Sequence, residues 1–310
     1  MERPGRLSRE RFGYSMPVDA PLYPKPPIYY TQAEAIAVAF ETDGDAAAAI
    51  VPEGLTVPSP AIAAVSVLTY PCSTLGTYNE AILSLAVLRS GEPGLYIAHI
   101  LVDNDQAMTA GREIWGFPKK LAHITLARRG EGIVGTVERP FGNRLCTVVV
   151  QPESPAAPGP VLPALSLRVI PSHRDDGAPD RAELVETRTT QTVHDEFTGR
   201  GSLGFGCISG IDPWSILPVN RLEHRNTVDR ARHPRGERRV IPTRPRRRCV
   251  ASNPSRSVAV GRAGDRSTHP GARPIPFSRS GREGRAARAG DPRSGAVTSS
   301  DTKMVPGRGC

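Results

Sequence analysis

The chain has 310 residues and a formal net charge of +9, which is distributed unevenly along its length. Residues 1–220 have a net charge of −6 (18 Lys+Arg, 24 Asp+Glu), whereas residues 221–310 have a net charge of +15 (22 Lys+Arg, 7 Asp+Glu). The basic pI therefore comes from the last 90 residues and does not indicate that residues 1–220 bind nucleic acid. No apolar run approaches the ~20 residues that cross a bilayer, and charges occupy the N-terminus where a signal peptide is apolar, so we expect a cytoplasmic protein without membrane contact.

Residues 1–30 form a predicted N-terminal arm. Five of its residues between positions 17 and 27 are prolines: Pro17, Pro21, Pro24, Pro26 and Pro27. Proline fixes φ and removes a backbone donor, which favours extended backbone over helix or sheet. We therefore expect an extended arm without a core of its own.

Residues 31–220 form the predicted folded domain. Short runs rich in Val, Ile and Leu, bounded by Gly, Pro, Asn or Asp, are typical of strands. The predicted strands are 35–42, 61–70, 81–89, 95–102, 121–128, 133–138, 145–151, 165–170 and 184–194. Helices are expected at 43–50, after an Asp cap, and at 103–115, where apolar residues have helical spacing. Many strands and few helices predict a mainly β (α+β) fold with an antiparallel, barrel-like body.

Residues 221–310 have a different composition. No leucine follows Leu222, Phe277 is the only aromatic residue, and Gly and Pro supply 19 of these 90 residues. Such a segment cannot bury enough apolar surface to offset its ordering entropy, so we expect a disordered tail. Two interpretations stay open: an Arg-rich tail that binds nucleic acid or an acidic partner, or the product of a frameshift in a GC-rich gene.

Lysine is rare in the first 220 residues, which contain 15 arginines and only Lys25, Lys119 and Lys120. The adjacent pair ends the sequence GREIWGFPKK at 111–120. Arginine stays protonated, whereas a lysine that loses its proton can attack a carbonyl and form a Schiff base. On spacing alone, the alternative is an ordinary solvated pair.

The sequence around the lysines resembles the acetoacetate decarboxylase family. The resemblance covers about residues 14–220 and fades after position 219. Its motifs are Asp103-Asn104-Asp105, Gly111-Arg112-Glu113, Pro118-Lys119-Lys120-Leu121, Thr42-Asp43, Val51-Pro52-Glu53, Gly76-Thr77-Tyr78-Asn79-Glu80, Thr192-Val193-His194, Thr198-Gly199 and Leu203.

The resemblance implies a lyase that decarboxylates a β-keto acid such as acetoacetate through an iminium and an enamine. Lys119 matches the Schiff-base lysine, Lys120 matches its neighbour, and Glu80 matches an acidic pocket residue. We expect Arg112 and Glu113 to form a supporting ion pair beneath the lysine. The resemblance also implies a homo-oligomer. The lysine itself is the electron sink, so we expect no cofactor, and the five separated cysteines suggest neither a metal site nor a disulfide framework.

Two positions depart from the family pattern. Ala33 stands where the family has an arginine near the pocket entrance, and Val65 stands where it has a second pocket glutamate. The further strand and helix that the family has after residue 219 are also missing from the tail. These departures leave three alternatives: aldolase or dehydratase chemistry on another keto acid, a non-catalytic binder that uses the basic tail, or an inactive product.

A Schiff-base lysine needs a neutral amine. If Lys119 and Lys120 follow Pro118 in extended chain, their side chains point to opposite faces and the charge repulsion between them is weak. We therefore predict that burial among apolar neighbours such as Trp115 or Phe117, rather than the charge of Lys120, favours the neutral form of Lys119. Lys120 is then expected to act through structure, by pairing with an acid.

Overall fold

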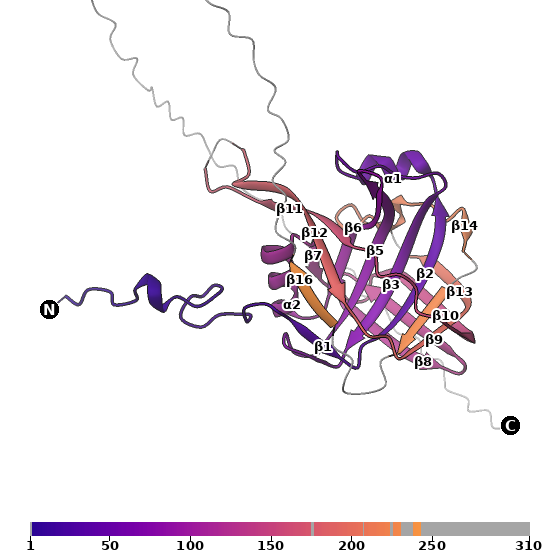
Figure 1. Cartoon of the computed structure of the whole chain (residues 1–310), viewed down its shortest axis with the longest axis horizontal. Coiled ribbons are helices and arrows are strands. Elements are labelled where there is room, and N and C mark those ends of the chain that lie inside the picture. The colour runs from indigo at the N-terminus through magenta and orange to yellow at the C-terminus, as the bar shows by residue number, and fades with distance from the viewer. Residues whose placement is uncertain (1, 175–176, 207, 224–225, 231–237, 243–310) are drawn as a thin grey trace, which may run out of the picture. The chain divides into compact units, whose positions relative to one another are not determined.

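The structure is a computed structural model that describes residues 2–174, 177–206, 208–223, 226–230 and 238–242. In these ranges, sixteen strands form one sheet that curls into a half-barrel (Figure 1). The strands are β1 (Tyr29–Thr31), β2 (Glu34–Thr42), β3 (Ala61–Tyr70), β4 (Cys72–Ser73), β5 (Tyr78–Arg89), β6 (Glu92–Val102), β7 (Lys119–Leu121), β8 (His123–Arg129), β9 (Gly132–Glu138), β10 (Arg144–Ala156), β11 (Ala164–Ile170), β12 (Arg181–Thr190), β13 (Asp195–Phe205), β14 (Arg221–Leu222), β15 (Asn226–Arg230) and β16 (Arg238–Pro242).

The sheet is almost entirely antiparallel. Its order is β4-β1-β16-β12-β11-β6-β5-β3-β2-β15-β13-β10-β9-β8, with β14 on β2 and β7 on β6. Only the pairs β6–β11 and β6–β7 are parallel among the described strands. The predicted mainly β, barrel-like body with few helices is confirmed.

Two short α-helices and three shorter helical turns complete the described elements. They are α1 (Gly44–Ile50), α2 (Asp105–Ala110), the 3-10 turns η1 (Arg9–Arg11) and η3 (Trp214–Ile216), and the π-helical turn η2 (Gly111–Trp115). Side-chain oxygens of Asp43 and Asn104 cap α1 and α2 by accepting backbone N–H groups at 2.8 Å. None of the described helices is long and apolar enough to cross a membrane.

Strands continue beyond residue 220, where the tail was expected to begin. β15 pairs with both β2 and β13, and β16 pairs with β1 and β12. Residues 243–310, most of the predicted tail, lie outside the described residues, so their disorder stays a prediction.

Alternating residues of β3 and β5 supply two apolar clusters, which therefore lie on opposite faces of the sheet. We call the larger one the main core: Ile36, Val38, Phe40, Ala47, Ala61, Ala63, Val65, Val67, Ala81, Leu83, Leu85, Val87, Leu101, Ile124, Ile133, Val137, Leu145, Cys146, Val148, Val150, Leu165, Trp214, Leu217 and Val228. We call the other the aromatic cluster: Tyr23, Ile28, Tyr30, Ala33, Ala35, Leu68, Tyr70, Leu75, Tyr78, Val102, Ala107, Ala110 and Trp115.

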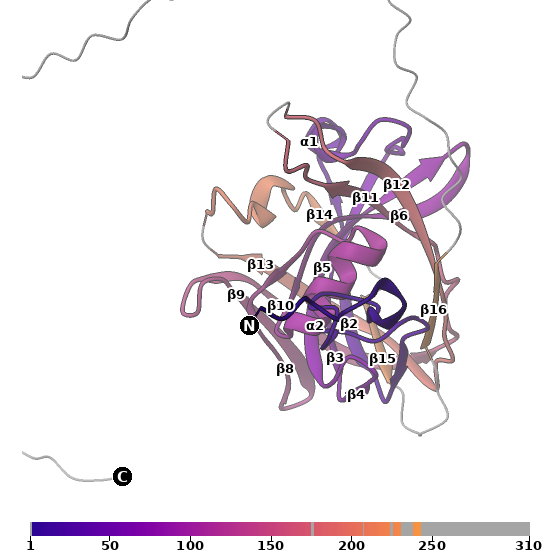
Figure 2. The ribbon, with the colours of Figure 1, turned by 90° about the vertical axis from the view of Figure 1, so that its left-hand side faces the viewer.

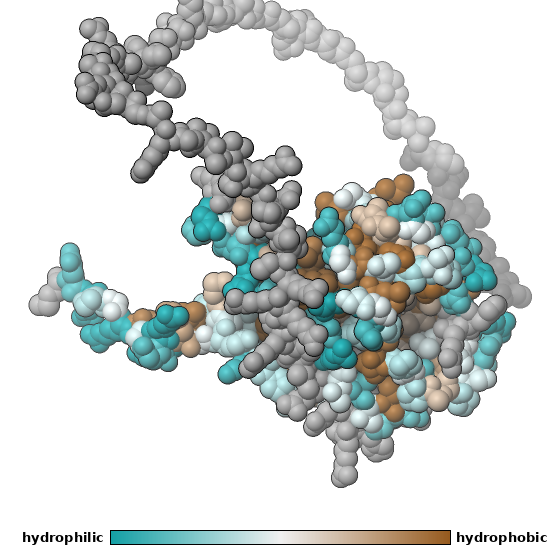
Figure 3. All heavy atoms as spheres, turned by 45° about the horizontal axis from the view of Figure 1, so that its top comes forward, coloured by the Kyte–Doolittle hydropathy of each residue, from teal (hydrophilic) through white to brown (hydrophobic). Residues whose placement is uncertain are grey.

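The aromatic cluster is covered by α2 and by the N-terminal segment. Figure 2 shows both of them in front of β2, β3 and β5. The arm residues Tyr23 and Ile28 are buried in this cluster. Four earlier arm residues have exposed side chains: Leu7, Phe12, Tyr14 and Met16. Figure 3 shows brown, hydrophobic atoms among teal ones along the projecting arm.

Candidate active site

Lys119 is the first residue of β7, and its side chain is buried on the aromatic-cluster side of the sheet. Only 6% of the side chain is exposed, and Nζ lies 2.6 Å from Oε2 of Glu80. The stem of Lys119 passes directly over Gly111, where a Cβ would lie 2.5 Å from Lys119 Cδ. A residue without a side chain at position 111 therefore gives the lysine its path to Glu80.

Glu80 reaches the amine from β5, two strands away from β7. Its side chain is 8% exposed, and Oε1 accepts a hydrogen bond from the Tyr70 hydroxyl at 3.3 Å. The structure thus joins Lys119 and Glu80, 39 residues apart in sequence, in one buried ion pair. Charges removed from water are stable only when paired or hydrogen-bonded, so each group depends on the other.

Aromatic rings surround the amine. Nζ lies 5.7 Å from the ring centre of Tyr78 and 5.9 Å from that of Phe117. Burial, with a smaller contribution from the Glu80 carboxylate, raises the pKa of Tyr78 well above its usual value, so this phenol stays protonated. Lys119 is therefore buried, as predicted, but its amine faces a carboxylate as well as two aromatic rings.

Lys120 points to the other face, which confirms the predicted divergence of the two lysines. Its Nζ lies 2.8 Å from Oδ1 of Asp212 and also donates to the carbonyl of Ile211. Asp212, 2% exposed, binds Arg139 Nε through its second oxygen at 3.0 Å. Lys120 therefore ties β7 to the segment before η3, and pairing with an acid is confirmed.

Burial lowers the pKa of His99, and the positive charge of Lys120 lowers it further, against a smaller opposing effect of Asp212. His99 lies on β6 two residues before Leu101, and Leu101 pairs with Lys120 of the neighbouring strand β7. The imidazole is therefore expected to be neutral at pH 7.

The expected ion pair between Arg112 and Glu113 is wrong. Arg112 Nη1 donates to the carbonyl of Lys119 at 3.1 Å, whereas the Glu113 carboxylate accepts the Tyr23 hydroxyl. Adjacent residues of a helical turn point in different directions, which explains the separate partners. Both residues contact the lysine segment or the arm, so a supporting role stays the prediction.

The two departures from the family pattern lie on different faces. Ala33 belongs to the aromatic cluster, on the side of Lys119, whereas Val65 belongs to the main core. A glutamate at position 65 would face the side of Lys120. The substitution at Val65 therefore does not change the immediate surroundings of the Lys119 amine.

Sequence analysis missed Asp212, Arg139 and the aromatic partners Tyr70 and Tyr78. Asp212 follows no periodic pattern and lies 92 residues from Lys120. Alternate residues of a strand share a face, so the sequence could have predicted that Tyr78 lies on the same face as Glu80.

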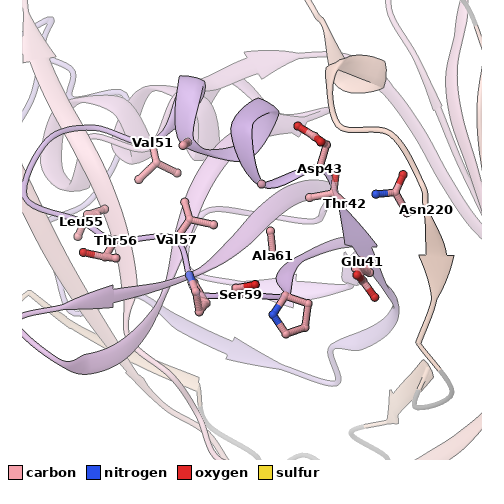
Figure 4. Close-up of a pocket in the computed structure, with 14 residues that line it drawn as sticks. Glu41, Thr42, Asp43, Val51, Leu55, Thr56, Val57, Ser59, Ala61 and Asn220 are labelled. Atoms are coloured by element: carbon pink, nitrogen blue, oxygen red, sulfur yellow. The ribbon is translucent and has the colours of Figure 1, made fainter.

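A pocket of about 580 Å³ lies elsewhere, between α1, the loop after it and the ends of β2 and β3 (Figure 4). Thr42, Val57 and Asn220 contribute to its lining, and none of the lysine-site residues does. Among the described residues, no three His, Cys, Asp or Glu side chains gather as metal ligands.

Comparison with known proteins adds three findings. The sequence profile of the family described as "Acetoacetate decarboxylase (ADC)" matches residues 15–230. Acetoacetate decarboxylase 1 of Bradyrhizobium diazoefficiens is 30% identical over 227 residues, which are 70% of this chain and 86% of that protein. Acetoacetate decarboxylase of Clostridium acetobutylicum is 30% identical over 216 residues, 67% of this chain and 86% of that protein.

Solved structures show the same fold. The crystal structure of acetoacetate decarboxylase from Legionella pneumophila matches with a TM-score of 0.66 and 25% identity, covering 78% of this chain and 96% of that one. The enduracididine biosynthesis enzyme MppR complexed with pyruvate matches with a TM-score of 0.62 and 20% identity, covering 74% and 95%. This second likeness is one of fold alone.

Proposed function

Because the chain belongs to the acetoacetate decarboxylase family, we propose that it is a lyase that decarboxylates a small β-keto acid such as acetoacetate through a Schiff base on Lys119. The observation that carries the proposal is the buried amine of Lys119, 2.6 Å from the Glu80 carboxylate. Family membership supports a lyase acting on a small keto acid, and the geometry supplies a mechanism for it.

The first step needs a neutral amine and a proton acceptor. Two buried charges are costly, and transfer of one proton from Lys119 to Glu80 within their hydrogen bond makes both groups neutral. The neutral amine then attacks the substrate carbonyl. The resulting carbinolamine takes a proton from Glu80 and loses water, which leaves a protonated imine and the Glu80 carboxylate.

The protonated imine is the electron sink. The bond to the carboxylate carbon breaks, carbon dioxide leaves, and the electron pair forms an enamine. The enamine carbon takes up a proton, and water hydrolyses the new iminium to release a ketone and regenerate Lys119. A carboxyl group such as Glu80 can carry the protons in these steps.

Lys120 has a positioning role in this proposal. Its ion pair with Asp212 holds it on the opposite face, so it fixes β7 without reaching the reacting carbon.

The same imine also serves aldol and dehydration chemistry. Two observations favour aldolase or dehydratase activity as the second candidate function. Ala33 lies on the lysine side of the sheet, and the fold resembles that of MppR, which was solved with pyruvate. The binder and inactive-product hypotheses depend on the tail and stay predictions.

Borohydride reduction in the presence of acetoacetate or pyruvate tests the proposal. We expect a covalent adduct that mass spectrometry assigns to Lys119, together with carbon dioxide release from acetoacetate. An adduct without carbon dioxide would favour the aldolase or dehydratase alternative, and no adduct with either compound would reject Schiff-base chemistry.

A further inference from the structure

The two tryptophans of the chain are both buried, Trp115 at 3% exposure and Trp214 at 2%. Neither indole N–H has a hydrogen-bond partner in the part of the chain that the structure describes. A buried indole N–H normally finds an acceptor, because leaving a buried donor unpaired forfeits its bond to water. Each of the two unpaired donors therefore needs an explanation.

Only Trp115 lies on the lysine side of the sheet. It belongs to the aromatic cluster, whereas Trp214 belongs to the main core on the opposite face. The indole of Trp115 stacks on Phe117 with ring centres 6.4 Å apart, and the same Phe117 ring lies 5.9 Å from Nζ of Lys119. Trp115 and the amine of Lys119 thus lie near the same phenyl ring.

The position of Trp115 is fixed by contacts that leave its N–H unused. Its carbonyl accepts a hydrogen bond from the hydroxyl of Ser166, on β11, at 2.7 Å. The following residue, Gly116, has a φ of +69° and no room for a side chain, since a Cβ would lie 2.5 Å from Arg168 Cα. The backbone at Trp115 is therefore fixed by contacts that do not involve the indole N–H.

A keto acid brings a carboxylate acceptor to the side of the sheet that holds Lys119. Burying this carboxylate beside aromatic side chains costs free energy unless a donor is present, and the amine of Lys119 is committed to the carbonyl carbon. We propose that Trp115 Nε1 donates a hydrogen bond to the carboxylate of the keto acid that reacts with Lys119, which makes Trp115 a specificity-determining residue. This inference rests on the proposed function.

A neutral donor suits a carboxylate that is to leave. The carboxylate loses its charge as it becomes carbon dioxide, so a strong ion pair would stabilise the bound substrate more than the transition state. An indole N–H binds the carboxylate with less of this penalty. The site should accept keto acids and discriminate against ketones of similar size that have no carboxylate.

The test compares Trp115→Phe with Trp214→Phe, a matched removal of the other unpaired indole. The readout is the ligand concentration that gives half-maximal borohydride trapping at Lys119, measured with acetoacetate, pyruvate and acetone. For Trp115→Phe we expect an increase of at least tenfold for the two keto acids and less than twofold for acetone. For Trp214→Phe we expect less than twofold for all three.

Unchanged keto-acid trapping in Trp115→Phe, with a labelled wild type, would overturn this inference alone. A wild type that is not labelled at Lys119 would reject the proposed function itself. Should Trp115→Phe not fold, the Trp214→Phe protein decides, because Trp115 is then its only tryptophan. Its fluorescence should change on addition of a keto acid and not of acetone, and an identical response to both would also overturn the inference.

Discussion

Lys119 forms an ion pair in the resting protein and must act as a nucleophile in the reaction. Lys119→Arg separates these two properties, because arginine keeps the positive charge for Glu80 but cannot form an imine. We expect the variant to stay folded and to lose roughly a thousandfold or more in turnover, which is ~4 kcal/mol of transition-state stabilisation. Circular dichroism and the carbon dioxide assay measure the two effects.

Glu80 is expected to act as the proton acceptor for the same amine. Glu80→Gln keeps the size and a hydrogen-bond acceptor but cannot take a proton, so imine formation should slow roughly a hundredfold, within the range of general acid–base catalysis. Glu138→Gln is the control, because Glu138 forms an ion pair with Arg144 at the surface. Equal trapping rates in the two variants would contradict the role of Glu80.

At the scale of the element, η2 shapes the path of the lysine. Gly111 has helical dihedrals (φ −58°, ψ −46°), so alanine suits its backbone and should stabilise the helix by about 0.5–1 kcal/mol. The new Cβ would nevertheless collide with the stem of Lys119. A displaced amine would leave Glu80 buried without its partner, which outweighs the gain in the helix. We therefore expect Gly111→Ala to unfold earlier than the wild type and to trap substrate at least tenfold more slowly, a loss of about 1.4 kcal/mol.

Gly44→Ala is the matched control for this variant. Gly44 is also helical, in the first turn of α1, but has open space where its Cβ would lie. The control should therefore leave substrate trapping unchanged. A Gly111→Ala protein that traps substrate as fast as the Gly44→Ala protein would show that the side chain of Lys119 adapts freely.

On the other face, His99 should report the charge of Lys120. Burial and Lys120 lower the pKa of His99, so removing the ammonium in Lys120→Met should raise it, since burial and the attraction of Asp212 remain. The unfolded chain binds a proton near pH 6.5 and the folded protein only at lower pH. Stability is therefore lost as the pH falls below 6.5, and the loss should be smaller in the variant.

Two measurements check this prediction. NMR titration gives the pKa of His99, with His99→Gln assigning the signal, and thermal unfolding at pH 5 and pH 7 gives the change in stability. A pKa that stays the same after Lys120→Met would place the ammonium too far from His99 to act on it.

The strands differ in how visible they are in the sequence. The alternating run at 61–70 coincides with β3, because one of its faces is buried along the whole strand. β13 was missed, because its Gly-rich sequence DEFTGRGSLGF is strand only through long-range pairing with β10. The predicted helix at 103–115 is divided at Gly111 into α2 and η2, a change that no periodicity reveals.

In the candidate site, too, some features were predictable from the sequence and others were not. The divergence of Lys119 from Lys120 follows from strand geometry, and the burial of Lys119 was predicted from the need for a neutral amine. Asp212 was not, because a loop residue is brought to its partner by the path of the whole chain rather than by any local pattern. The separate partners of Arg112 and Glu113 likewise depend on the arm and on β7.

At the scale of the whole molecule, strands after residue 220 close gaps in the sheet. β15 joins β2 to β13 and buries Val228 completely, and β16 joins β1 to β12. A chain that ends at 220 leaves four strand edges unpaired and open to aggregation. A chain that ends at 242 keeps every described strand. We therefore expect residues 1–242 to unfold cooperatively and residues 1–220 to aggregate or to melt at a lower temperature.

Truncation at residue 242 separates the sheet from the basic tail. Residues 1–242 should still form the Lys119 adduct, because every residue placed near the amine precedes position 242. The full-length chain would bind nucleic acid with a steep salt dependence if the tail has that role, and residues 1–242 would not. These properties are measured by thermal unfolding, borohydride trapping and nucleic-acid binding at two salt concentrations. Equal melting temperatures for residues 1–220 and residues 1–242 would show that the strands after residue 220 contribute no stability.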